Sequence, residues 1–520
     1  MFADTSGQKD RVFLILTGVW LFTALFLFGN PVILDYLHPI KEQKNPVLNA
    51  MLQGEQNIGL SPKENYQLVL ATLGLVCVLG FSRLAKPMLR LPDGLPKWLA
   101  WLPLAWFGWQ VLSLLQTANQ AMSIATVIHF ASCLAAFYLG LLVLARMRLA
   151  KLALWGAALG LILNLVNACQ EQFGGLELTR NSIIERLVTP SVLENWLEFR
   201  YTTLDHPEKS PSQPGDEGKT IPAEIEKQIA ALPPETAAKV RELPLELVKR
   251  MYSTRLYGRM FYPNALAGVI LLLLPVSLAL LLGQGRWLVP RYALTLGLAA
   301  VGLACLYWSG SKAGWLIALV LLGAWFLHLP LSRKLKLCLA SAAMVLGLAG
   351  FALKYGDYFD RGATSVGARF GYWQAAVQTA VEEPLLGTGP GTFQLAYKQH
   401  RALELIEAIK KGDIEAVKKA SDAEPTRLAH NDYLQQASDS GWPGFALYAA
   451  FIGGAAWVLA RRRLDDPLLL AVRLGLLAWL LQGFVEFGLY IPALAWPAWL
   501  MLGWLLAGPT NRFDKSVATE

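Results

Sequence analysis

His430 and Asn431 stand side by side at the end of a polar segment that runs from about Tyr355 to Ser440, and Gly441 follows after nine residues. A long apolar run begins directly after this segment. Histidine can take up a proton near neutral pH, so His430 would offer a base where a water-facing loop re-enters an apolar layer. A reaction between a lipid-borne donor and a hydroxyl group in water requires such a base. Taken alone, a histidine at this position is more often structural or exposed.

Cationic side chains from separate segments flank the other apolar runs. They are Arg255, Arg259, Lys312 and Arg369. Guanidinium and ammonium groups gathered where water is scarce suit a pyrophosphate group, and a helix that begins near Asn264 could add its N-terminal amides. Two other readings stay open. Arg255, Arg259 and Lys312 could reach lipid phosphates at the interface, and Arg369 could be a surface charge of a helix.

Metal and nucleotide sites are not indicated. The other histidines form no pair at a spacing of three or four residues, and the five cysteines show neither metal spacing nor a disulfide framework. The turn Gly387–Gly391 resembles a phosphate loop only in composition, because no Gly-Lys-Ser/Thr follows. Among the acidic residues Glu486 stands out at the outer end of an apolar run, where it is either a solvated helix end or a member of the site.

The elements that must position these residues are membrane helices. Hydrophobic residues make up 54% of the 520 positions and charged residues only 16%. Apolar runs of about 17–25 residues predict transmembrane helices. We therefore expect an all-α, polytopic membrane protein with about twelve transmembrane helices, several of them short, over residues 12–29, 67–82, 98–115, 121–144, 152–170, 263–283, 289–308, 313–329, 334–353, 441–460, 467–486 and 489–507.

The basic residues of the short loops predict the orientation. With twelve spans they all fall on one side, which the positive-inside rule assigns to the cytoplasm together with both termini. These residues are Lys9, Arg11, Arg83, Lys86, Arg90, Lys97, Arg146, Arg148, Lys151, Arg286, Arg291, Arg333, Lys334, Lys336 and Arg461–Arg463. The net charge of +8 is therefore mostly this bias. No long basic run interleaved with aromatic residues is present, so nucleic acid is not expected as a partner.

This topology divides the chain into five parts: N-terminal helices (1–170), an outer segment (171–262), central helices (263–353), a large outer loop (354–440), and C-terminal helices with a cytoplasmic tail (441–520). Residues 200–250 read as an insert with short amphipathic helices at 221–232 and 235–250, either an accessory element on the membrane surface or a substrate contact. In the large loop we expect a helix that includes 369–377 and ends at 382–384, a tight turn at 387–391 and a charged helix over 401–420.

Four motifs resemble those of the O-antigen ligase and polymerase superfamily of bacterial membrane glycosyltransferases. The resemblance covers about residues 255–507, and loosely the spans before them. In chain order the motifs are Arg255-x-x-Gly258 with Pro263-Asn264, Ser311-Lys312-Ala313-Gly314-Trp315, Arg369-x-x-x-Trp373 with Pro384-Leu385-Leu386-Gly387-x-Gly389, and His430-Asn431-x9-Gly441. Two features depart from the family: Lys312 replaces its usual arginine, and the insert near 200–250 has no counterpart.

The resemblance implies a GT-C-like helical fold in the bacterial inner membrane, with residues 354–440 as a periplasmic catalytic loop. It implies metal-independent glycan transfer, without a cofactor, from undecaprenyl diphosphate. It assigns the pyrophosphate to Arg255 and Arg369 and activation of the acceptor to His430. Asn431, Lys312, Arg259, Trp373 and Asn264 are then expected to contact the substrates, with membrane lipids around them.

The acceptor stays open at this point. Lipid A-core sugar (a ligase) is narrowly favoured over another lipid-linked glycan (a polymerase) and over a protein hydroxyl (an oligosaccharyltransferase). A transporter of a small anion or of lipid-linked glycan is the alternative from a different class. A transporter predicts charged residues deep inside the spans, whereas most charges of this sequence lie at the ends of the spans.

Overall fold

The computed structural model describes residues 5–29, 62–82, 91–92, 95–147, 149–175, 196, 199, 223–234, 237, 254–260, 262–283, 288–360, 364–414, 417 and 426–508. Most of the insert at 200–250 lies outside these residues, as do Arg83, Lys86, Arg90, Arg148 and Arg286. Within the insert, α10 (Ala223–Ala230) matches the first amphipathic helix predicted there. Apart from one isolated β-bridge between Gly29 and Met260, the regular structure of the described residues is helical.

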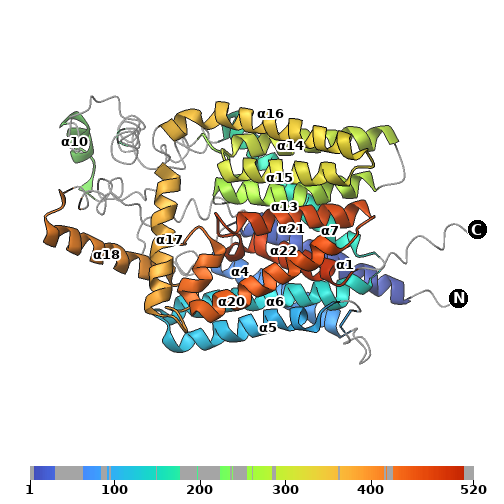
Figure 1. Cartoon of the computed structure of the whole chain (residues 1–520), viewed down its shortest axis with the longest axis horizontal. Coiled ribbons are helices and arrows are strands. Elements are labelled where there is room, and N and C mark those ends of the chain that lie inside the picture. Colours follow the sequence, from blue (N-terminus) through green and yellow to red (C-terminus); the bar gives the residue numbers. More distant parts are fainter. Residues whose placement is uncertain are drawn as a thin grey trace, which may run out of the picture.

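The apolar helices lie roughly side by side in one bundle (Figure 1). They are α1 (Thr5–Leu27), α4 (Pro62–Phe81), α5 (Lys97–Leu112), α6 (Gln120–Tyr138), α7 (Lys151–Gln170), α13 (Pro263–Leu282), α14 (Leu288–Trp308), α15 (Lys312–His328), α16 (Arg333–Asp360), α20 (Asp432–Arg461), α21 (Pro467–Gln482) and α22 (Pro492–Leu506). Eight helical segments of the described chain are long and apolar enough to cross a membrane. Four further helices are apolar but shorter, so the predicted count of twelve crossings stays a prediction.

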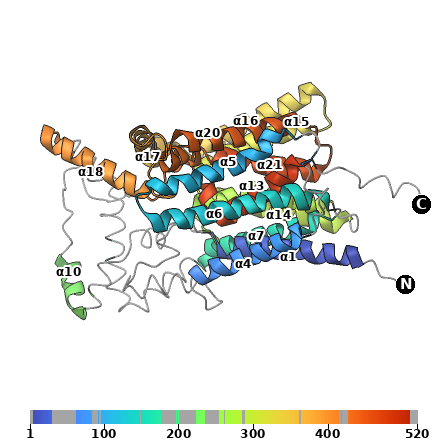
Figure 2. The same cartoon turned by 90° about the horizontal axis from the view of Figure 1, so that it is seen from below.

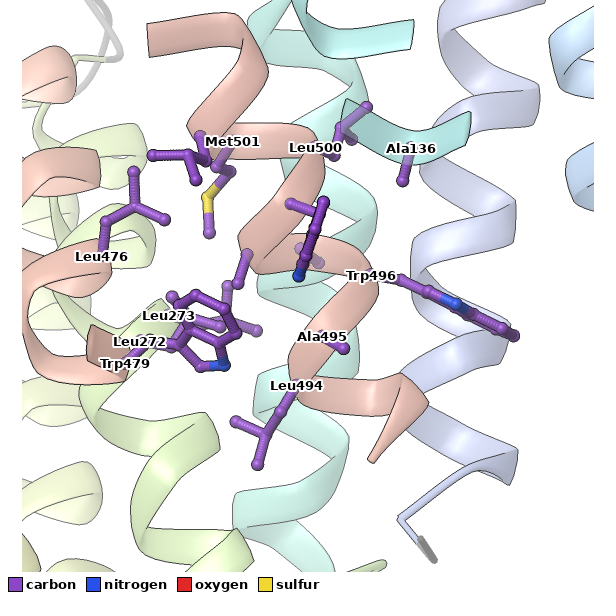
Figure 3. Packing of buried hydrophobic residues seen from close by; sticks show 14 of the residues in the cluster. Ala136, Leu272, Leu273, Leu476, Trp479, Leu494, Ala495, Trp496, Leu500 and Met501 are labelled. Atoms are coloured by element: carbon purple, nitrogen blue, oxygen red, sulfur yellow. The ribbon is translucent and has the colours of Figure 1, made fainter. Parts of the chain in front are cut away.

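Helix α22 forms the centre of the bundle. All its residues are buried, and it contacts α1, α6, α13 and α21. Figure 3 shows Trp496, Leu500 and Met501 of α22 among side chains of α6, α13 and α21. On the side of α1, the ring centroids of Trp496 and Trp20 are 5.6 Å apart. Because lipid is as apolar as these side chains, van der Waals packing rather than the hydrophobic effect holds such helices together.

Small residues allow the closest helix contacts. Where α1 crosses α7, a Cβ atom added to Gly156 would lie 1.9 Å from the carbonyl oxygen of Gly18. Glycine at both positions lets the two backbones touch, which compensates for the missing hydrophobic driving force within a membrane.

Two helices of the large loop stand outside the bundle at one of its ends. These are α17 (Thr364–Glu382) and α18 (Phe393–Lys411); α1 begins at the opposite end (Figures 1 and 2). Helix α17 confirms the helix predicted around 369–377, and Pro384 follows its end as expected. Helix α18 begins before the predicted range 401–420. It ends at Lys411, also earlier than predicted, because Gly412 in the left-handed conformation (φ 66°) terminates it.

Candidate active site

The carboxylate of Glu486 is the centre of the candidate site. It is 5% exposed, in the segment between α21 and α22. Its Oε1 atom accepts hydrogen bonds from Arg369 at 2.5 Å and from the Asn264 amide at 2.6 Å. Its Oε2 atom lies 3.2 Å from Nδ1 of His430. One buried carboxylate therefore joins three predicted site residues from distant parts of the chain.

Electrostatics keep this carboxylate charged. Burial raises the pKa of Glu486, but the charge of Arg369 and the contact with His430 outweigh burial and hold the pKa below its usual value. A buried carboxylate is tolerated when it is paired and hydrogen-bonded. Glu486 is both, so it can orient its partners as a fixed negative charge.

Aromatic rings fix the imidazole of His430. The ring of Tyr372 stacks on it at 5.8 Å between centroids, and the ring of Phe487 meets it edge-on at 4.8 Å. The indole nitrogen of Trp373 donates to the backbone oxygen of His430 at 3.3 Å. Among the described residues His430 is the only non-glycine residue with a positive φ, 51°. Such left-handed backbone is costly for a residue with a side chain and occurs where the surroundings enforce it.

The contact with Glu486 also sets the tautomer of His430. A charged carboxylate accepts hydrogen bonds and does not donate them, so Nδ1 carries the hydrogen in this contact. In the neutral ring Nε2 then keeps its lone pair. Nε2 makes no hydrogen bond to any described residue, and the side chain is 23% exposed. The free nitrogen can therefore accept a proton from a bound hydroxyl group.

Arg255 is tied to the same cluster through Asn264. Its guanidinium donates to Oδ1 of Asn264 and, through Nε, to the backbone oxygen of Ser309, both at 2.8 Å. Burial lowers the pKa of Arg255 from its ordinary value. The ordinary pKa of arginine is so high that the guanidinium stays charged in proteins. Pro263 occupies the first position of α13, as predicted, so Asn264 lies in the first turn, where backbone amides lack partners in the helix.

Three residues that are predicted to contact the substrate make contacts within the protein in this structure. The Asn431 side chain caps α20 by accepting from the amides of Tyr433 and Leu434, both at 3.0 Å. The Arg259 guanidinium lies over the ring of Phe26, 4.2 Å from its centroid. The Lys312 ammonium lies 3.7 Å from the ring centroid of Tyr358. By capping the start of α20, Asn431 helps to fix the position of His430, the residue before it.

The turn at 387–391 docks on a kink in α20. The amides of Thr388 and Gly389 donate to the backbone oxygens of Ser438 and Asp439 at 3.1 and 2.9 Å, and the Gly391 amide donates to the Asp439 carboxylate at 2.8 Å. The kink is at Ser440 and Gly441. The amides of this turn therefore bind protein groups, which agrees with the argument against a nucleotide cradle.

Sequence reasoning missed several members of the site. Tyr372 and Phe487 enclose the imidazole, and only their proximity to Trp373 and Glu486 in the sequence hinted at this. The sequence does not decide whether Glu486 is a solvated helix end or a member of the site; its burial excludes the solvated helix end. Among the described residues no group of three or more His, Cys, Asp and Glu side chains could hold a metal ion.

Comparison with known families agrees with the motifs. Residues 297–449 match the family model described as O-antigen ligase. The match extends from α14 into α20 and includes Lys312, Arg369, His430 and Gly441. No curated protein matches the chain.

Proposed function

The chain belongs to the O-antigen ligase superfamily, and from this premise we propose that it transfers a glycan from undecaprenyl diphosphate to an acceptor hydroxyl at the periplasmic face of the bacterial inner membrane. The coarser part of this statement, a multi-pass membrane protein of a glycosyltransferase-like family that acts on lipid-linked glycans, follows from the family match and the apolar helices. The donor, the acceptor, the stereochemistry and the orientation are the proposal.

The observation that carries the proposal is the contact between His430 and Glu486 beside two arginines. In the proposed reaction the acceptor oxygen attacks the anomeric carbon from the face opposite the diphosphate, which inverts the configuration. The bond between that carbon and the diphosphate oxygen breaks as the new glycosidic bond forms. Nε2 of His430 takes the proton of the acceptor hydroxyl, and Glu486 stabilises the imidazolium that results.

Arg255 and Arg369 would stabilise the charge that builds on the departing diphosphate. Glycosyl diphosphates are already activated, so these two guanidinium groups can substitute for a metal ion. Two arrangements favour this role. Arg255 and Arg369 contact opposite ends of the Asn264–Glu486 pair, and the Nε atom of Arg369 is buried without a partner among the described residues. A buried donor without a partner lowers stability unless a ligand accepts its hydrogen bond.

Lipid A-core sugar remains the favoured acceptor, with a second lipid-linked glycan or a protein hydroxyl as alternatives. A transporter fits less well. The buried carboxylates of the described chain are Asp432, Asp439 and Glu486. All three lie before the kink of α20 or beyond the end of α21, where the site is, and not along the middle of the spans.

Deletion of the gene in the native host, followed by analysis of surface glycans, tests the proposal. A ligase predicts loss of capped lipopolysaccharide while long lipid-linked chains accumulate, and a polymerase predicts products with a single repeat. Complementation with His430→Ala should fail, and complementation with the matched variant His400→Ala, on the outer helix α18, should succeed. Uptake or flipping of a solute without any glycan transfer by the purified protein would overturn the proposal.

A further inference from the structure

Three cations surround the turn between α14 and α15. Arg255 donates to the backbone oxygen of Ser309 at 2.8 Å, and the Lys354 ammonium donates to the backbone oxygen of Tyr307. Lys312 is the first residue of α15. Lys354 was not singled out in the sequence, because it lies at the end of a predicted span.

The packing of α16 on α15 explains how Lys354 reaches this turn. The indole nitrogen of Trp315 donates to the backbone oxygen of Gly347 at 3.1 Å, which fixes the two helices against each other. Lys354 follows Gly347 by seven residues, about two helical turns, and so lies on the same face of α16. The position of its ammonium is therefore set by helix packing.

The ammonium groups of Lys312 and Lys354 add positive charge at this turn. Among the residues that the structure describes, neither Lys312 nor Lys354 forms an ion pair with a carboxylate. The first turn of α15 holds no acidic residue, and a cation at a helix N-terminus opposes the helix dipole. The charges of Arg255, Arg369 and Lys354 all act unfavourably on Lys312. A bound anion would relieve this repulsion.

A buried hydroxyl group in the same place also lacks a partner. Tyr355 is 7% exposed, and its hydroxyl makes no hydrogen bond to any described residue. The Lys312 ammonium lies 5.3 Å from the ring centroid of Tyr355, and the Lys354 ammonium lies 5.4 Å from it. Native structures rarely leave such a group unsatisfied, because the lost hydrogen bond with water is not replaced.

We propose that Lys312, Lys354 and Tyr355 form a second phosphate subsite beside Arg255, so that the two phosphates of a lipid diphosphate are bound by different groups. The inference rests on the proposed function and names the part of the site that recognises the second phosphate. A lysine retains further N–H donors when it binds one backbone oxygen, so Lys354 can contact the backbone of α14 and a phosphate together.

Binding of two probe lipids to the purified protein in nanodiscs tests the subsite. We would measure the dissociation constants of undecaprenyl diphosphate and undecaprenyl monophosphate for the wild type, Lys354→Gln, Lys354→Arg and Tyr355→Phe. Lys336→Gln, at the other end of α16, is the matched control. Lys354→Gln should bind the diphosphate about 10- to 100-fold more weakly, with little change for the monophosphate. Lys354→Arg should retain most of the affinity, and Lys336→Gln should match the wild type.

Tyr355→Phe separates binding from a structural role. If the hydroxyl is only an unsatisfied buried group, its removal leaves both affinities unchanged and does not lower the unfolding temperature. The subsite predicts weaker diphosphate binding instead. Equal losses for both lipids, or an unchanged preference for the diphosphate in Lys354→Gln, would overturn the inference. A wild-type protein that shows the predicted binding but transfers no glycan would overturn the proposed function and leave the subsite standing.

Discussion

Nδ1 of His430 lies 3.2 Å from Oε2 of Glu486, although the whole of α20 and α21 separates the two residues in the chain. The contact brings the start of α20 to the segment that follows α21. It leaves the other ring nitrogen of His430 without a hydrogen bond to any described residue, on a side chain that is 23% exposed. The proposed chemistry depends on this division between an oriented nitrogen and a free one.

Replacement of His430 by alanine should nearly abolish turnover and leave donor binding largely intact, because the histidine is proposed to act on the acceptor. Loss of a general base typically costs about 10²–10⁴ in rate. Single-turnover rates and donor affinity in nanodiscs measure the two effects, with His400→Ala as the control. Loss of donor binding in His430→Ala, together with normal binding in arginine variants, would reverse the assignment of roles.

Replacement of Arg255 or Arg369 by alanine should weaken both donor binding and turnover, because each would contact the diphosphate before and during the reaction. We expect donor affinity to fall by about 10- to 100-fold. Lysine should restore only part of it, since an ammonium lacks the planar fork of a guanidinium. Arg401→Ala, an arginine of α18 that pairs with Glu404, controls for loss of charge on this face. A full rescue by lysine would show that the positive charge alone, and not the shape of the guanidinium, binds the diphosphate.

Replacement of Glu486 by glutamine should reduce turnover and destabilise the fold, because Arg369 and His430 lose their charged partner. Breaking a buried ion pair costs about 3–5 kcal/mol, and the partial exposure of Arg369 places this pair at the lower end. The difference in unfolding free energy between the wild type and Glu486→Gln, called the stability gap below, also depends on pH. The pKa of Glu486 in the folded state is depressed. The stabilisation from its charge is therefore fully present at pH values above its pKa in the unfolded state, about 4.3. It is lost as the pH falls through the lower pKa of the folded state.

Thermal unfolding of wild type and Glu486→Gln at a series of pH values measures this gap. The gap should be present near neutral pH and shrink below about pH 4. Glu382→Gln, which alters an exposed carboxylate paired with Gln378, should show no gap. A gap that grows on acidification would contradict the role given to Glu486.

Purified enzyme should keep its activity in excess chelator, because the charge on the leaving diphosphate is assigned to side chains. The measurement is transfer from undecaprenyl diphosphate-linked glycan with and without chelator, followed by addition of magnesium or manganese. Activity that vanishes with the chelator and returns with either ion would disprove this mechanism.

The predicted topology puts α18 outside the cell membrane and the loop after α20 inside. Cysteines introduced at Lys411 and Arg463, both exposed, should differ in labelling by an impermeant thiol reagent in cells with a permeable outer membrane. Cys338 is exposed and should first be replaced. Lys411→Cys should react in intact cells, and Arg463→Cys only after lysis. Equal labelling in intact cells would refute the orientation.

The local features of the site could be predicted from sequence because each depends on few neighbouring residues. The spacing from Asn431 to Gly441 is an example. Asn431 caps α20 and Gly441 kinks it with φ 70° and ψ −179°, a conformation that is essentially restricted to glycine. A Cβ atom at Gly441 would also lie 2.4 Å from the backbone oxygen of Leu385. The two motifs of the large loop are therefore parts of one packed unit.

The partners in the site could not be predicted, because they depend on how distant helices pack. Glu486 looks the same in the sequence whether it faces water or three donors. Lys354 looks like the end of a span, and only the packing of α16 on α15 brings it to the turn after Tyr307. Asn431 was expected at the substrate, yet its side-chain oxygen is occupied by two backbone amides.

Three helices that begin or end beside the site are shorter than an ordinary bilayer is thick. Helices α15, α21 and α22 have 17, 16 and 15 residues, or about 23 to 26 Å at 1.5 Å per residue, against a hydrocarbon thickness of about 30 Å. Helix α22 is buried in the bundle, but α15 exposes Leu316, Val320 and Trp325, and thinning of the bilayer beside α15 would accommodate its length. We expect the membrane to form a dimple above Lys312 and Glu486. A lipid carrier drawn into it would present its sugar below the level of the surrounding headgroups, and the acceptor would have to descend to meet it.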